Sequence, residues 1–244
     1  MRYLTKLNKI LFFPLLTLAV ILTFYKTPLP PLTHIDDKLI TDTPKITKIY
    51  EDPLVKNFNG TNYKITPLYD IEITGLVVEQ YDSENLLDIT HKNDPAQSKD
   101  LCLTWNDNLT NETYLKAKYS HGEFTCFFNF KDRSGFGKFH QNMFTNTHLI
   151  PENQTLKKII KDAKKGDQVY IKGKLINYAI LDENAKEIRT RQTSITFEDR
   201  DCEVILVSDF EYIKRQNYFI REAKYISYKI LFITALINTI LFFV

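Results

Sequence analysis

Two uncharged apolar runs lie close to the ends of the chain, at 10–25 and 230–244. Both are shorter than the ~20 apolar residues that usually cross a bilayer as a helix. No pair of small residues typical of a signal-peptide cleavage site follows the first run, so we expect it to be retained. The pattern therefore predicts a transmembrane anchor at 10–25 and a C-terminal transmembrane segment at 230–244.

Basic residues near these runs predict conflicting topologies. Arg2, Lys6 and Lys9 precede the first run, which predicts a cytoplasmic N-terminus at 1–9 and a globular domain facing the periplasm of a bacterial inner membrane. Five basic residues between 214 and 229 precede the second run. Taken alone, they favour the alternative of a cytoplasmic domain.

The chain between the two apolar runs divides into three segments of different composition. The segment 26–48 is rich in proline and threonine and predicts an extended linker. A globular domain follows at 49–208, and 209–229 is predicted to be an amphipathic juxtamembrane helix.

Alternation of apolar and polar residues indicates that the globular domain is mostly β. Strands are predicted at 69–81, 101–105, 123–130, 167–181, 188–197 and 203–207, and a turn with two glycines at 131–137. One helix is predicted at 151–166, because its apolar residues recur at helical spacing and Gly166 suits the C-cap. Gly173 lies inside a predicted strand, where glycine often marks a bulge or a sharp bend.

This order of elements predicts a mainly β fold with one helix, an OB-like small barrel, flanked by N- and C-terminal transmembrane helices. The alternative is an α+β sheet domain. OB barrels bind oligonucleotides, sugars or proteins, so this fold class does not determine a function.

Composition excludes several function classes. The net charge of +2 gives no electrostatic reason to expect nucleic-acid binding. With only seven glycines, a glycine-rich phosphate-binding loop is not expected. The five histidines show none of the usual metal-binding spacings, so we predict no metal and no cofactor.

Several short motifs occur in a distinctive order. Asp100 precedes Leu-Cys-Leu-Thr-Trp105, Asn146-Thr-His-Leu-Ile-Pro precedes the predicted helix, Gly166-Asp-Gln-Val opens the next strand, and Cys202-Glu203 follows. Over 69–207 this succession resembles an uncharacterised family of bacterial membrane-anchored proteins with an OB-like β domain. The chain departs from that family in a shortened loop at 199–201 and in having Phe197 where the family has arginine. The resemblance implies location and architecture, and brings no activity.

Asn146 and His148 are the main catalytic candidates, and Glu203 is a third. Asn146 and His148 alternate on an extended segment, so both side chains face the same way. His148 could act as a general base or ligand oriented by Asn146. In the structural alternative, the imidazole binds a backbone carbonyl and the segment fills the end of the domain.

Three cysteines are present. Cys102 and Cys126 lie on successive predicted strands and form a disulfide candidate in an oxidising compartment. In a cytoplasmic domain all three would be small buried residues. Cys202 stands among acidic neighbours, which raise a thiol pKa, so a catalytic thiol is not expected.

Two further features have ordinary structural explanations. The acidic stretch from Asp82 to Asp100 is expected to be a solvated loop. The phenylalanines between 124 and 144 are expected to pack mostly in the core, with one of Phe127 and Phe128 exposed.

The function predicted from the sequence is a non-enzymatic, membrane-anchored envelope protein that acts as a binding or assembly module for a protein partner. Its predicted binding residues are Trp105, Asn146, His148 and Arg191. The alternative is a hydrolase-like envelope enzyme that uses the Asn146/His148 region. The sequence leaves the oligomeric state open.

Overall fold

The structure is a computed structural model that describes residues 2–25, 27–84, 88, 91–198 and 201–243. The chain divides into two compact units. One combines the two ends of the chain, 1–28 and 217–244, and the other comprises 29–216.

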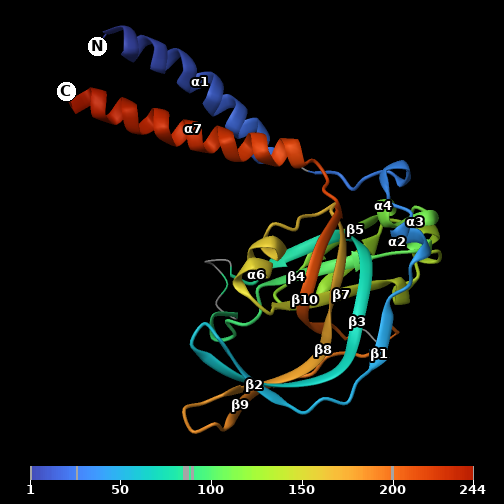
Figure 1. Ribbon diagram of the computed structural model, residues 1–244. Coiled ribbons are helices and arrows are strands. Elements are labelled where there is room, and N and C mark those ends of the chain that lie inside the picture. Colours follow the sequence, from blue (N-terminus) through green and yellow to red (C-terminus); the bar gives the residue numbers. More distant parts are fainter. Residues whose placement is uncertain (1, 26, 85–87, 89–90, 199–200, 244) are drawn as a thin grey trace. The chain divides into compact units, whose positions relative to one another are not determined.

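The unit made from the two ends is a pair of helices (Figure 1). They are α1 (Arg2–Phe24) and α7 (Tyr218–Phe243). Ala19 on α1 and Ser227 on α7 are buried, and the hydroxyls of Thr23 and Tyr228 are hydrogen-bonded to each other. The two ends of the chain therefore pack against each other as helices.

The predicted transmembrane anchors are not supported. Among the described residues, no helix is both long enough and apolar enough to cross a membrane. The uncharged runs at 10–25 and 230–244 are short, and the first half of α7 carries Arg221, Glu222 and Lys224. The predictions of transmembrane helices, of an inner-membrane location with a periplasm-facing domain, and of integral association with the membrane are therefore wrong.

The unit 29–216 is mostly β sheet with several short helices. Its strands are β1 (Lys45–Lys48), β2 (Leu54–Phe58), β3 (Thr61–Asp82), β4 (Lys99–Thr104), β5 (Ala117–His121), β6 (Cys126–Phe130), β7 (Phe144–Pro151), β8 (Gln168–Leu181), β9 (Glu187–Arg191) and β10 (Glu203–Lys214). Its α-helices are α2 (Lys38–Thr41), α3 (Asp107–Thr110), α4 (Thr113–Lys116), α5 (Arg133–Phe136) and α6 (Gln154–Lys161). Short 3-10 helices occur at Leu32–His34, His91–Asn93 and Gln141–Met143.

Within the described residues, all strands except β5 and β6 form one eight-stranded sheet (Figure 1). Its order is β1-β3-β4-β7-β10-β8-β9, with β2 also paired to β3 and a further pairing between β3 and β8. β7 and β10 are parallel, and the other pairs are antiparallel. β5 and β6 form a separate two-stranded hairpin.

The predicted fold class is wrong. In place of an OB-like barrel with a single helix between two membrane spans, the chain forms an eight-stranded sheet domain with several helices. The missed helices α2 to α5 are only four residues long each, which is too short for an apolar period of 3.6 residues to show in the sequence.

The strand β10 is longer than predicted. It continues to Lys214, so the juxtamembrane helix predicted from residue 209 is replaced by strand up to that point. Its pairing with β8 shifts between Val207 and Asp209, opposite Gly173. A Cβ atom on Gly173 would lie 2.2 Å from the Leu206 carbonyl oxygen, so only glycine fits there. The bulge predicted from Gly173 is therefore present in the pairing of β8 with β10.

The helix α6 is the predicted one, shortened at both ends. Asn153 caps it by accepting a hydrogen bond from the Leu156 amide. Leu156 and Ile160 are buried in the main core cluster, together with apolar residues of β3, β4, β8 and β10. Gly166 follows with a φ of +89°, a conformation that favours glycine.

Candidate functional site

The pairing of β4 with β7 assembles a polar cluster inside the sheet domain. Asp100 lies opposite His148, and Cys102 lies opposite Asn146. Because alternate residues of a strand share a face, these four side chains point to one side of the β4–β7 pair. Asp100, Cys102 and His148 are fully buried, and Asn146 is 6% exposed.

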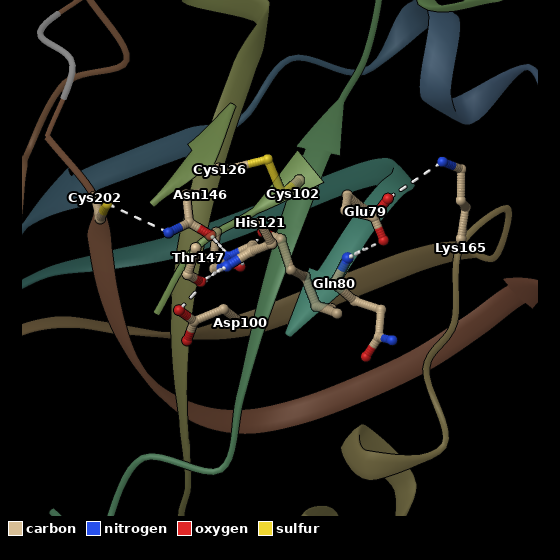
Figure 2. The surroundings of a disulfide bond; sticks show 12 residues. Glu79, Gln80, Asp100, Cys102, His121, Cys126, Asn146, Thr147, Lys165 and Cys202 are labelled. Carbon is tan, nitrogen blue, oxygen red and sulfur yellow. Dashed lines mark hydrogen bonds and ion pairs between the residues drawn. A yellow bond between two sulfur atoms is a disulfide. The ribbon is translucent and has the colours of Figure 1, made fainter. Parts of the chain in front are cut away.

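The β5–β6 hairpin lies beside this polar cluster and is joined to it covalently. A disulfide links Cys102 of β4 to Cys126 of β6. His121, paired with Cys126 in the hairpin, reaches into the cluster. Its Nε2 atom lies 3.0 Å from Asn146 Oδ1 and 3.7 Å from Asp100 Oδ2 (Figure 2).

His148 has contacts on both ring nitrogens. Its Nδ1 lies 2.8 Å from Asp100 Oδ2, and its Nε2 accepts a hydrogen bond of 2.6 Å from Arg191 Nη2. Burial lowers the pKa of His148 below its usual value, and the charges of Arg191 and His121 add to this, whereas Asp100 opposes it. Arginine can only donate, so His148 Nε2 is an acceptor, and His148 Nδ1 faces both Asp100 Oδ2 and the Gln97 amide nitrogen, which lies 2.9 Å away.

Arg191, at the end of β9, is fixed from three sides. Besides its bond to His148, its Nη1 donates to Gln97 Oε1 at 3.3 Å. Its guanidinium carbon lies 5.1 Å from the centre of the Phe124 ring, a cation–π distance. Gln97 in turn donates to Asp100 Oδ1 at 2.6 Å, which completes a ring of contacts through Arg191, His148, Asp100 and Gln97.

Asn146 connects the cluster to Cys202. Its amide nitrogen donates to the Phe124 carbonyl at 3.0 Å and contacts the Cys202 sulfur at 3.4 Å. Figure 2 shows the Asn146 amide pointing to Cys202, on the side away from the disulfide. Burial raises the pKa of the Cys202 thiol to about 11, helped by Glu203. The thiol is therefore protonated at neutral pH and is a poor nucleophile.

A second histidine–aspartate pair lies next to the cluster. Asp88 is hydrogen-bonded to His91 Nδ1 and accepts a bond of 2.8 Å from the Tyr81 hydroxyl. The Tyr81 ring stacks on His121, with ring centres 5.3 Å apart. Burial acts to raise the pKa of Asp88, but these hydrogen bonds lower it to about 2, so the carboxylate is ionised.

Two cavities adjoin this polar cluster. The first, of about 400 Å³, is largely apolar and is lined by Phe127, Phe128, Phe136 and Phe144. The second, also about 400 Å³, has polar walls that include Arg191, Gln192, Thr193 and Ser194. Both are lined by Thr125, Asp201 and Cys202, so the cavities meet at these three residues.

The predicted site residues are only partly brought together. Asn146, His148 and Arg191 belong to the polar cluster, and Asn146 and Arg191 also line a cavity. Trp105 lies in the main core, 2% exposed, with its ring against Phe197. Glu203 is buried and accepts a hydrogen bond from the Thr145 hydroxyl.

The expectation that the acidic stretch is solvated is wrong for its second half. Asp88, Asp94 and Asp100 are 4%, 5% and 0% exposed. Asp94 and Asp100 have partners on distant strands, and strand pairing is not visible in the sequence. The partners of Asp88, Tyr81 and His91, are close to it along the chain. Residues 199–200 of the shortened loop, and 85–87 and 89–90 of the acidic stretch, lie outside the described residues.

Sequence reasoning also missed Gln97, His121 and His91. Asp88, His91, Asp94 and Gln97 recur at every third position of one connecting segment. That spacing was the available signal. Its meaning depends on the conformation of this segment, which contains the 3-10 turn His91–Asn93 and in which all four side chains are buried.

Neither an arrangement of metal-ligating side chains nor a match to a known protein assigns a chemistry to this site. In the described parts of the chain, no three side chains among His, Cys, Asp and Glu are arranged to hold a metal ion. No protein-family model and no curated protein matches the chain.

Proposed function

We propose that the sheet domain is a non-enzymatic binding module for a small molecule, and that its site is the pair of cavities that meet at Thr125, Asp201 and Cys202. The observation that carries this proposal is the adjacency of an apolar and a polar cavity, each of about 400 Å³. Small-molecule sites are typically concave, mostly apolar and furnished with a few placed polar groups.

The walls of the site are held in place before any ligand arrives. The Cys102–Cys126 disulfide ties the β5–β6 hairpin to β4. Asn146 is held by hydrogen bonds to His121 and to the Phe124 carbonyl, and Arg191 by its bond to the buried His148. Such preorganisation favours binding, because less side-chain freedom is lost when the ligand enters.

A hydrolase-like function has less support. A general base needs a ring nitrogen that can reach the substrate. His148 is fully buried and contacts Asp100 and Arg191 through its two nitrogens. The Cys202 thiol is protonated at neutral pH. The arrangement therefore suits positioning and recognition better than proton transfer to a substrate.

The proposal is tested with the neutral apolar dye N-phenyl-1-naphthylamine and a variant that blocks the junction. Thr125 is exposed and lines both cavities, so Thr125→Trp fills the junction without disturbing the core. We expect the full chain to bind the dye with enhanced fluorescence, and Thr125→Trp to weaken that binding at least tenfold.

Thr190→Trp is the matched control. Thr190 is equally exposed on β9 and lines neither cavity. The Thr190→Trp variant should bind the dye as tightly as the unmodified chain does. Absence of dye binding, or equal binding by Thr125→Trp and the unmodified chain, would refute the proposed site.

A further inference from the structure

The polar cavity contains a cation with no direct counter-ion. Arg191 is half-buried, and its contacts among the described residues are with His148, Gln97 and the Phe124 ring. None of these groups carries a negative charge. Asp100 carries a negative charge, but it is connected to Arg191 only through His148 and Gln97.

This arrangement is costly in the absence of an anion. A partly buried charge is stabilised chiefly by a paired opposite charge and good hydrogen bonds. A guanidinium has five N–H groups, and two of those of Arg191 are used in its bonds to His148 and Gln97. In the described part of the chain the remaining three make no hydrogen bond, so they are available as donors, and Arg191 lines the polar cavity.

The side chain of Arg191 cannot easily turn away from the cavity that it lines. The bonds to His148 and Gln97 hold its two terminal nitrogens, and the cation–π contact with Phe124 restrains the group further. A planar, fixed guanidinium is the group that proteins use to bind carboxylates with two parallel hydrogen bonds.

Asp201 limits the charge of the anion. It lines both cavities together with Thr125 and Cys202, at the place where they meet. A ligand with a second negative charge would lie close to this carboxylate, and like charges repel. A monoanion is therefore favoured over a phosphate or a dicarboxylate.

The neighbouring cavity identifies the rest of the ligand. Phenylalanines line it, and beyond Thr125, Asp201 and Cys202 its polar lining is confined to Gln141, Thr145 and Asn146. An aryl or alkyl group extending from a carboxylate at Arg191 would enter this apolar space and bury its surface there, which favours binding.

We propose that the ligand is a monocarboxylic acid with an aryl or alkyl tail, its carboxylate bound by Arg191 and its tail held among the phenylalanines of the adjoining cavity. This inference rests on the proposed function, because it names the ligand class of the same site.

The test compares 4-phenylbutyrate with its neutral amide, 4-phenylbutanamide, by isothermal titration calorimetry on the full chain. A charge-assisted hydrogen bond is roughly twice as strong as a neutral one. We therefore expect the acid to bind about tenfold or more tightly than the amide. The dianion 4-phenylbutyl phosphate should bind more weakly than the acid.

Arg191→Gln should remove the preference for the acid and leave the affinity for the amide unchanged. Arg189→Gln is the matched control, because Arg189 is an exposed arginine on the same strand that lines neither cavity. The Arg189→Gln variant should still bind the acid more tightly than the amide. The comparison of acid with amide on the unmodified chain needs no variant, so it decides the question even where Arg191→Gln folds poorly.

The outcomes separate the two proposals. Equal affinity for acid and amide, with dye binding intact, overturns the carboxylate inference and leaves the binding module standing. Tighter binding of the phosphate overturns the restriction to a monoanion. Failure of the dye, the acid and the amide to bind at all overturns the proposed function itself.

Discussion

Two buried aspartates, Asp94 and Asp100, lie six positions apart and have opposite surroundings. Asp94 accepts hydrogen bonds from the hydroxyls of Tyr63 and Tyr178. Both tyrosines belong to an apolar core cluster. Asp100 contacts His148 and Gln97, and through them it is connected to Arg191 in the wall of the polar cavity.

The difference shows how a structural buried acid can be told from one at a site. Exposure does not separate them, since both are nearly inaccessible. The distinction is where the hydrogen bonds lead. At Asp94 they end at side chains packed in the core, whereas at Asp100 they continue to a cation that lines a cavity. Removing either aspartate should destabilise the fold, but only changes around Asp100 should alter ligand binding.

The largest effect is expected at the enclosed aspartate. Asp94→Ala leaves two buried tyrosine hydroxyls without their acceptor, at about 1–3 kcal/mol each. We expect the free energy of unfolding in urea to fall by about 4 kcal/mol. The affinity of the folded variant for 4-phenylbutyrate should stay unchanged.

Asp52→Ala, at an exposed position, is the control and should change neither quantity. If Asp94→Ala weakened phenylbutyrate binding while leaving stability intact, the contrast between the two aspartates would be wrong.

The next effect concerns Lys99, the immediate neighbour of Asp100 on β4. Its ammonium is fully buried and donates to the Lys161 carbonyl at the end of α6, at 2.7 Å. Burial lowers the pKa of Lys99 to about 7, and Lys164 lowers it further, while Asp82 and Asp162 oppose the shift.

The sign of the pH dependence follows from this shift. The unfolded chain keeps the ordinary lysine pKa, so above pH 7 it binds more protons at this residue than the folded chain does. The contribution of Lys99 should therefore make the fold more stable as pH rises, by about 2 kcal/mol between pH 7 and pH 9.

Urea unfolding at several pH values, compared between the unmodified chain and Lys99→Met, measures this contribution. Between pH 7 and pH 9, the free energy of unfolding should rise by about 2 kcal/mol less in Lys99→Met than in the unmodified chain. Lys158→Met, on the exposed face of α6, should retain the full rise. Parallel pH curves for the unmodified chain and Lys99→Met would contradict the prediction.

The smallest effect is a matched pair of hydroxyl removals. Tyr178→Phe deprives Asp94 of one of its two tyrosine partners, and we expect a loss of about 2 kcal/mol. Tyr81→Phe deprives Asp88 of one bond, but Asp88 keeps its bonds to the backbone and ring of His91, so about 1 kcal/mol is expected.

Thermal unfolding of both variants measures the difference. A larger loss for Tyr81→Phe than for Tyr178→Phe would show that the cavity-side cluster is the more tightly coupled of the two.

Local patterns in the sequence were sufficient for several of the longer regular elements. Alternation predicted most of β3, β4, β6 and β8 and the start of β10, and helical spacing predicted α6. Gly173 indicated the irregularity between β8 and β10. These features depend on neighbours along the chain, which is why they can be read directly.

Local patterns were misleading at the ends of the chain. The apolar runs at 10–25 and 230–244 were interpreted as membrane spans, but the structure pairs α1 with α7, and no helix of the described residues satisfies the requirements for a span. Hydrophobicity alone does not say which apolar partner a helix will pack against.

The sequence by itself determined the β-rich character of the domain, its longest strands and the helix α6, because periodicity records which face of each element is buried. It also singled out Asn146, His148 and Arg191. Only the tertiary structure decided that His148 faces Asp100, that Gln97 and His121 complete the cluster, and that Trp105 belongs to the core. The physical reason is that these contacts depend on strand register and on loop conformation, which bring together residues dozens of positions apart.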